Sequence, residues 1–340
     1  MLLFSAFIVA LVGTMVLIPP LMRVAERLSV MDLPDERKVH SGAIPRIGGI
    51  AMMVGVMLPI LLWLPVDRIL TGVLLALVVL LLFGAWDDSR DLDYRVKFLG
   101  QFMAVLLVVI VGDVKFAVFP FAGLDPVSDF LSIPVTVLFL VGTTNAVNLS
   151  DGLDGLAAGV SLLSLCAIAV LAYLGEGQDI VLICFAVAGA IFGFLRFNTY
   201  PARIFMGDTG SQFLGFMLGA LSIVLTQKSN TALNPAIPLF LVGLPIIDTI
   251  FVMFKRLSEG GSPFSPDRNH IHHRIMALGM AHYETVVIIY LTQIGFVVSA
   301  IFLRYESDLM VVTCYLVLSG ALLSILLLAK EREWNAKHSR

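Results

Sequence analysis

Long apolar runs alternate with short polar segments along the whole chain. A helix needs about 20 apolar residues to cross a bilayer, so the runs predict an all-α polytopic membrane protein with about eleven transmembrane helices. The runs lie at 2–22, 48–64, 68–86, 97–112, 131–148, 156–174, 179–196, 211–226, 235–256, 283–303 and 309–329. Pro245 lies inside the ninth run and is expected to kink that helix. Because no repeat or linker interrupts the pattern, residues 1–340 are predicted to form a single integral membrane domain.

Composition supports a membrane environment. Hydrophobic residues make up 59% of the 340 positions and charged residues only 14%, against roughly 25% in soluble domains. A soluble fold of this length would lack the polar surface to cover itself. The net charge of −3 gives no basic field for nucleic acid, so no nucleic-acid partner is expected.

The lysines and arginines predict an orientation. The segments that follow odd-numbered predicted spans hold 18 of the 22, and the other side holds only Arg68, Lys115, Lys228 and Arg304. The positive-inside rule then places the odd-numbered loops in the cytoplasm, with the N-terminus outside and the C-terminus inside.

The same assignment places the most polar segments on the cytoplasmic side. The first is the loop Met31 to Gly49, where prolines and glycines predict an ordered loop. Its Lys38, His40 and Arg46 are candidates to hold phosphates, although a plain topology anchor is the alternative. The second is the acid pair Asp87 and Asp88 at the inner end of the third run. Adjacent carboxylates at a membrane boundary repel each other unless a cation lies between them, although solvated helix-end acids are the simpler alternative.

The third segment spaces four polar side chains three residues apart, at Asn145, Asn148, Asp151 and Asp154. Such a stripe drifts around an α-helix but stays aligned in a tighter turn. Amide and carboxylate oxygens on one face suit Mg²⁺ or the ribose and base of a nucleotide. In the fourth segment, Asp208 precedes an apolar helix, so it is either an N-cap or a metal ligand beside a phosphate-binding helix N-terminus.

The fifth segment, Leu257 to His282, carries His270, His272, His273 and Arg274. Zinc is one interpretation of three histidines, but no cysteine or acid at the usual ligand spacing accompanies them. A cationic, hydrogen-bonding grip on phosphate is favoured. Asp248 stands apart inside the ninth run, where an acid is a functional candidate by default. It is predicted either to line the floor of the site or to pair internally.

Together these segments predict a Mg²⁺-dependent phosphoryl transfer between a nucleotide and a membrane lipid, because such a reaction needs positioning, a metal and cations more than a covalent residue. The alternative of another class is a transporter or flippase, which predicts polar groups near the bilayer midplane. The functional interpretation requires that loops 31–49, 87–97, 145–155, 203–211 and 257–282 share one side.

Five motifs give the chain a family resemblance: PDERKVHSGAIPRIGG, WDDSRDLD, TNAVNLSDGLDGLAAG, RIFMGDTGS and SPDRNHIHHRI. In this order they make it similar to the polyprenyl-phosphate N-acetylhexosamine-1-phosphate transferases, over most of its length. The resemblance implies transfer of a sugar 1-phosphate from a UDP-sugar to undecaprenyl phosphate, with release of UMP. That reaction begins lipid-linked synthesis of O-antigen, enterobacterial common antigen or teichoic acid at the bacterial inner membrane.

The resemblance also implies residue roles. Asn148 and Asp208 would bind Mg²⁺, with Mn²⁺ as an alternative, and Asp87 and Asp88 would be the catalytic acidic pair. Asp151 and Asp154 would order the active centre or contact the nucleotide. The remaining residues would bind substrate: Lys38, Arg46, Asn145, His270, His272, His273 and Arg274.

Two departures bear on the donor sugar. A relative that uses a phospho-muramoyl-pentapeptide donor has a contiguous histidine triple, which Ile271 interrupts here. Asp91 follows the acid pair where that relative has a lysine. Both departures favour UDP-GlcNAc, with another UDP-N-acetylhexosamine or phospho-muramoyl-pentapeptide as the alternative. Direct attack by the lipid phosphate is expected rather than a two-step path, and a homodimer is left open.

Overall fold

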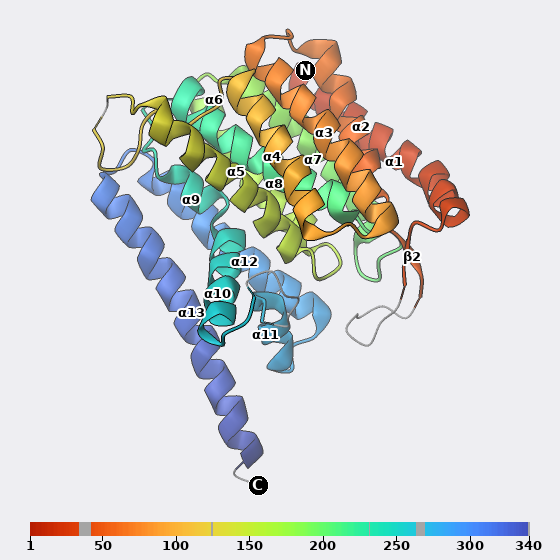
Figure 1. Ribbon diagram of the computed structural model, residues 1–340, viewed down its shortest axis with the longest axis vertical. Coiled ribbons are helices and arrows are strands. Elements are labelled where there is room, and N and C mark those ends of the chain that lie inside the picture. The colour runs from red at the N-terminus through yellow and green to blue at the C-terminus, as the bar shows by residue number, and fades with distance from the viewer. Residues whose placement is uncertain (34–41, 124, 231, 263–268, 339–340) are drawn as a thin grey trace.

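The computed structural model describes residues 1–33, 42–123, 125–230, 232–262 and 269–338 (Figure 1). Its helices are α1 (Leu2–Leu28), α2 (Gly48–Trp63), α3 (Arg68–Arg90), α4 (Tyr94–Ile110), α5 (Asp129–Ser150), α6 (Leu156–Leu174), α7 (Gln178–Asn198), α8 (Gly207–Val224), α9 (Ile237–Leu241), α10 (Gly243–Ser258), α11 (Ile271–Ala277), α12 (His282–Leu303) and α13 (Asp308–His338). A π-helical turn, η1 (Leu225–Ser229), extends α8. Two short strands, β1 (Met31–Asp32) and β2 (Ile44–Pro45), pair antiparallel.

The helices confirm an all-α polytopic membrane protein. Within the described residues, eight helices are long and apolar enough to cross a bilayer: α1, α3, α5, α6, α7, α8 with η1, α12 and α13. The other three predicted runs fall on α2, on α4 and on the pair α9 and α10, which are shorter. Each predicted run thus contains helix, because local hydrophobicity is the main signal for such segments.

The ninth run differs from expectation in where it breaks. The break lies at Val242, between α9 and α10, rather than at Pro245. Pro245 occupies the first turn of α10, where a missing N–H leaves no intrahelical hydrogen bond unmade. The proline therefore starts a helix here instead of kinking one.

Helix α8 forms the centre of the bundle. Every residue from Thr209 to Thr226 is buried, and α8 packs against α2, α3, α5 and α6. Two glycines allow this close approach. A Cβ at Gly84 of α3 would lie 2.6 Å from Thr209 Cα, and one at Gly49 of α2 would lie 2.2 Å from Gly210 N. Small residues at helix contacts in membranes serve this purpose, and here they bring α2 and α3 against the start of α8.

The outer parts of the fold frame this centre (Figure 1). The β1–β2 hairpin is tied to the loop before α8, because Phe205 donates its N–H to Pro45 O at 2.8 Å. Helices α10 and α11 and the start of α12 lie at the same end of the bundle as the C-terminal half of α5, and α12 then runs back along α6 and α9. Helix α13 contacts the rest of the protein sparingly and ends well away from the bundle at the C-terminus.

Candidate active site

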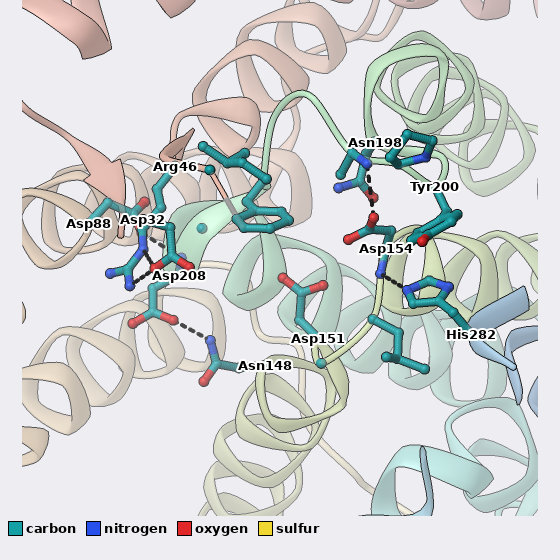
Figure 2. A pocket seen from close by; sticks show the side chains of 18 of the residues that line it. Asp32, Arg46, Asp88, Asn148, Asp151, Asp154, Asn198, Tyr200, Asp208 and His282 are labelled. Carbon is teal, nitrogen blue, oxygen red and sulfur yellow. Dashed lines mark hydrogen bonds and ion pairs between the residues drawn. The ribbon is translucent and has the colours of Figure 1, made fainter. Parts of the chain in front are cut away.

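A cavity of about 670 Å³ opens where all five polar segments meet (Figure 2). Its lining includes Arg46 from the first loop, Asp88 and Lys97 from the second, and Asp208 from the fourth. The third and fifth segments contribute these residues: Asn148, Asp151, Gly152, Leu153, Asp154 and His273. Residues as far apart in sequence as Asp32 and His282, a separation of 250 residues, therefore face one space.

The last turn of α3 joins the first turn of α8 through Asp88. One carboxylate oxygen accepts the backbone N–H of Asp208 at 2.6 Å. The other accepts the backbone N–H and the hydroxyl of Thr209, at 3.1 and 2.6 Å. Both oxygens are thus occupied by the start of a helix, where unpaired N–H groups favour an acid. This arrangement fixes the position of Asp208.

Lys97, in the first turn of α4, bridges two acids. Its Nζ lies 2.6 Å from Asp87 Oδ2 and 2.7 Å from Asp208 Oδ2. The other oxygen of Asp208 accepts from Asn148 Nδ2 at 2.6 Å, and that amide also donates to Ser211 Oγ at 2.8 Å. Asp208 is therefore held by α3, α4 and α5 together. Asp87 does not line the cavity itself and reaches it through Lys97.

Asp151 lies in the middle of the cavity, just after α5 ends (Figure 2). Burial, together with the charges of Asp208, Asp154 and Asp88, raises its pKa to about 7. The neighbouring acids thus leave negative charge that no described cation fully balances. That is the electrostatic situation in which a divalent cation or a cationic ligand group binds well.

Asp154 anchors the other half of the cavity (Figure 2). It accepts the backbone N–H of Ala202 at 2.9 Å, and its own N–H points to His282 Nε2 at 3.2 Å. The His282 ring stacks on Tyr200, with centroids 4.5 Å apart. This half offers an aromatic surface beside backbone and carboxylate groups, a composition suited to a planar or ring-shaped part of a ligand.

Arg46 sits at the cavity edge, after β2. It pairs with Asp32 across the hairpin and with Asp91 at 2.9 Å. Burial opposes its charge, but the hydrogen bonds and charges of the two acids raise its pKa overall. Lys38, predicted to act with it, lies outside the described residues.

Of the four residues predicted from the histidine motif, His270, His272, His273 and Arg274, His273 lines the cavity and the other three lie behind it. His270 and His272 are buried, at 5% and 3% exposure. Burial, then the neighbouring His273 and His270, lowers the pKa of His272 to about 3, so this ring stays neutral. Arg274 lies over the Phe251 ring at 4.3 Å and donates to Asn269 O, away from the lining.

Asn145 also lies outside the lining. Its amide pairs with Gln101, donating at 2.6 Å and accepting at 3.2 Å. The reason is that α5 stays helical through Ser150, so the stripe of four polar residues is not a single tight turn. Asn148 faces the cavity from the helix, and Asp151 and Asp154 face it from the loop.

Several cavity residues were not predicted as site residues: Asp32, Lys97, Asn198, Tyr200 and His282. Lys97 was interpreted only as one of the cytoplasmic positive charges. Its pairing with Asp208 spans 111 residues, so no local pattern reveals it. Asp32 had a weak signal, as an acid facing Arg46 across a short loop.

The donors present fit Mg²⁺, the cofactor that the sequence resemblance implies. Within the described residues, no three His, Cys, Asp or Glu side chains form a ready-made metal cluster. Mg²⁺ is commonly bound by one or two carboxylates together with waters and substrate phosphates. Asp208 and Asn148, in contact with each other and facing the cavity, match that smaller set, and Asp151 lies in the same cavity.

Comparison with known proteins gives a consistent result. The glycosyl transferase family 4 profile matches residues 70–226. A probable undecaprenyl-phosphate N-acetylglucosaminyl 1-phosphate transferase of Bacillus subtilis is 39% identical over 301 residues, covering 88% of this chain and 84% of the relative. A decaprenyl-phosphate N-acetylglucosaminephosphotransferase of Mycolicibacterium smegmatis is 36% identical, covering 78% and 73%. An undecaprenyl-phosphate alpha-N-acetylglucosaminyl 1-phosphate transferase of Escherichia coli K12 is 30% identical, covering 78% and 74%.

Proposed function

Since the chain belongs to glycosyl transferase family 4 and is a sugar-phosphate transferase of the polyprenyl-phosphate N-acetylhexosamine-1-phosphate group, we propose that it transfers N-acetylglucosamine 1-phosphate from UDP-GlcNAc to undecaprenyl phosphate. The product is a lipid-linked sugar diphosphate, and UMP leaves. The names of the relatives support the acceptor and the sugar. The observation that carries the proposal is the meeting of Asp208, Lys97, Asn148 and Asp151 at one cavity.

The acceptor needs little activation. A phosphate monoester has a second pKa near 6 and is mostly dianionic at pH 7. We propose that one of its oxygens attacks the β-phosphorus of the donor directly. The bond between that phosphorus and the oxygen bridging to the α-phosphate breaks, and UMP leaves with the electron pair. No general base is required, so the protein acts by positioning and by stabilising charge.

The residues divide this work between them. Lys97 neutralises negative charge that develops on the donor's diphosphate beside Asp208. His273 and Arg46 border the same cavity. Asp88 and Asp87 hold Asp208 and Lys97 in place through the contacts described above. Asp208 and Asn148 would hold Mg²⁺, which when bound would neutralise the donor's diphosphate. The half of the cavity with Asp154 and Tyr200 is proposed to receive an end of the nucleotide sugar.

A donor panel tests the function. Purified protein is given undecaprenyl phosphate and one of several UDP-N-acetylhexosamines or UDP-muramoyl-pentapeptide, and UMP and lipid product are measured with Mg²⁺, with Mn²⁺ and with a chelator. The expected result is product with UDP-GlcNAc that requires a divalent cation and lipid phosphate. Reaction with another donor alone would correct the sugar and keep the reaction class. No UMP with any donor would overturn the proposal.

A trapping experiment tests direct attack. Protein, labelled UDP-GlcNAc and metal are mixed without lipid acceptor, and the protein is denatured and analysed by mass. Direct attack predicts no label on the chain. A sugar-phosphate or phosphate adduct on an aspartate would establish the two-step path through a covalent intermediate.

The same proposal includes the location of the enzyme and its orientation in the membrane. We propose a bacterial inner-membrane enzyme with eleven crossings, the N-terminus outside, and the cavity facing the cytoplasm, where UDP-sugars occur. Its product would start O-antigen, common-antigen or teichoic-acid synthesis. Labelling of single cysteines placed in the loops near Asp91 and Asp125 from each side of intact cells tests the orientation. The loop near Asp91 should react only from the cytoplasmic side.

A further inference from the structure

Asp248 is a buried acid in the mostly apolar first half of α10. It is 4% exposed and does not line the large cavity. An unpaired carboxylate in such a place would be costly. Both of its oxygens are instead occupied by the histidine segment: Oδ2 lies 2.8 Å from His270 Nδ1, and Oδ1 accepts the N–H of Ile271 at 2.8 Å.

These two contacts set the start of α11. Ile271 is the first residue of α11, and His270 is the residue before it. From there three rings follow one another toward the cavity. His270 and His272 are nearly parallel, 7° apart with centroids at 5.9 Å, and His272 lies 4.2 Å from His273. His273 then reaches the cavity wall. The position of His273 therefore depends on a contact made two residues earlier, at a buried acid.

His272 also touches the loop that carries Asp151. A Cβ at Gly152 would lie 2.2 Å from His272 Nε2, so only glycine leaves room for this ring. His272 Nε2 is buried and has no hydrogen-bond partner among the described residues. Its place is therefore fixed by packing and by its neighbours along α11. The contact links Asp248 to both sides of the cavity, through His273 and through the turn at Asp151.

The carboxylate also selects a form of His270. Since a carboxylate only accepts hydrogen bonds, His270 Nδ1 must carry the proton that points to Asp248. An asparagine at position 248 could still accept the N–H of Ile271 through its oxygen. Its amide nitrogen would then face His270 Nδ1 as a donor and would require the opposite tautomer. The substitution Asp248→Asn thus changes the tautomer required of His270 but keeps the hydrogen bond that supports the start of α11.

We propose that Asp248 is a positioning residue of the transfer reaction. It holds His270 in the Nδ1–H form and α11 in register, and thereby keeps His273 and the Asp151–Gly152 turn in place beside the diphosphate of the bound nucleotide sugar. This inference rests on the proposed function. It gives the acid within the ninth apolar run a task in catalysis, with no need for an ion pathway.

The test compares Asp248→Asn with Asp248→Ala, His270→Asn and the double variant Asp248→Asn/His270→Asn. Steady-state kcat and KM for UDP-GlcNAc and for lipid phosphate are measured together with thermal unfolding in detergent. Asp308→Asn is the matched control, since Asp308 also accepts one backbone N–H, from Phe121, and one side-chain amide, from Asn234, but lies far from the cavity.

Asp248→Asn is expected to lower kcat by about 10–100-fold, the scale seen when the partner behind a functional histidine is removed. The melting temperature and the KM for lipid phosphate should stay near those of the wild type. The double variant should lose no more than the worse single variant, because the two residues act as a unit. Asp308→Asn should retain wild-type kcat.

Two results would overturn the positioning role. One is wild-type kcat in Asp248→Asn. The other is a loss in every variant that tracks the fall in melting temperature and adds up in the double variant. Wild-type protein that forms no product with any donor would instead overturn the proposed function, before any variant is compared.

Discussion

Helices α4, α5 and α8 carry a lysine–aspartate network at each of their two ends. At one end Lys97 bridges Asp87 and Asp208, with Asn148 beside them. At the other end Lys115 pairs with Asp129 at 2.6 Å, and Lys228 pairs with Asp113 at 2.8 Å. The same residue types therefore build a network at each end of these helices. Within the described residues, the first network lines the cavity of about 670 Å³, whereas the second contributes Lys228 to the edge of a smaller one of about 440 Å³.

Burial and charge balance separate the two ends. The Asp129 side chain is 65% exposed, whereas that of Asp87 is 2% exposed. At the Asp129 end, two lysines face two aspartates. At the Asp87 end, one lysine faces two aspartates, and further acids line the same space. Exposed pairs contribute about 0–1 kcal/mol, whereas buried, unbalanced acids are typical of functional sites.

The largest expected effect comes from removing the carboxylate of Asp208, which both Lys97 and Asn148 contact. Asp208→Asn should lower kcat by roughly 10³-fold, because it removes a proposed Mg²⁺ ligand and the partner of Lys97, the two cations placed to stabilise developing charge. Asp113→Asn, its counterpart at the other end, should change kcat by less than about 2-fold, since an exposed pair is worth little. UMP release by the two variants measures this. Equal losses would mean that the two networks do not differ as described.

The second comparison removes the two lysines. Lys97→Met should lower kcat by roughly 10²-fold, because Asp87 and Asp208 then repel each other and the diphosphate loses a cation. Lys115→Met should leave kcat near wild type. Donor titrations on both variants check the result. A Lys97→Met enzyme with normal kcat and KM would restrict Lys97 to a structural pairing.

A smaller effect is expected from adding a methyl group at a tightly packed glycine. Gly152→Ala brings a methyl group against the His272 ring and should lower kcat about 10-fold, with a lower melting temperature. Gly142→Ala is the control, because nothing lies within 4 Å of a Cβ at that position of α5. Alanine there should raise stability by up to about 1 kcal/mol, through helix propensity. Equal behaviour of the two variants would contradict the packing described at His272.

The smallest effect concerns pH and stability. The folded-state pKa of Asp151, about 7, lies above its ordinary value of 3.8. Between these values the folded protein keeps a proton that the unfolded chain releases, so stability falls as pH rises and the loss is complete above about pH 7. Asp151→Asn removes the ionisable carboxyl group and with it this pH-dependent loss of stability. In chelator, its melting temperature should exceed that of the wild type most at pH 8, with the gap shrinking toward pH 5.

The exposed Asp125 provides the control for that titration. Asp125→Asn should follow the wild-type melting curve at every pH. A gap for Asp151→Asn that grows as pH falls would reverse the sign of the charge effect assigned to the neighbouring acids.

The sequence predicted the helices better than it predicted the contacts between them. Hydrophobic length is a local property, so each apolar run fell on helix, and the five polar segments were rightly grouped. The position of the break near Pro245 depended on the first turn of α10, which hydropathy does not report. Lys97 and Thr209 remained hidden because their partners lie 111 and 121 residues away. Asn145 was placed with the site because its spacing matched, although α5 turns its amide toward Gln101.

The hydrogen bonds of Asp88 have a consequence for the physical cost of the reaction. Three donors from the start of α8 point at one carboxylate of α3. In water, dipoles would have to turn as charge moved between the phosphates, and that turning is a large part of a reaction barrier. Here the N–H groups of Asp208 and Thr209 and the Thr209 hydroxyl are already oriented in the folded protein. The joint between α3 and α8 thus fixes these dipoles through folding, which is the kind of preorganisation that lowers a reaction barrier.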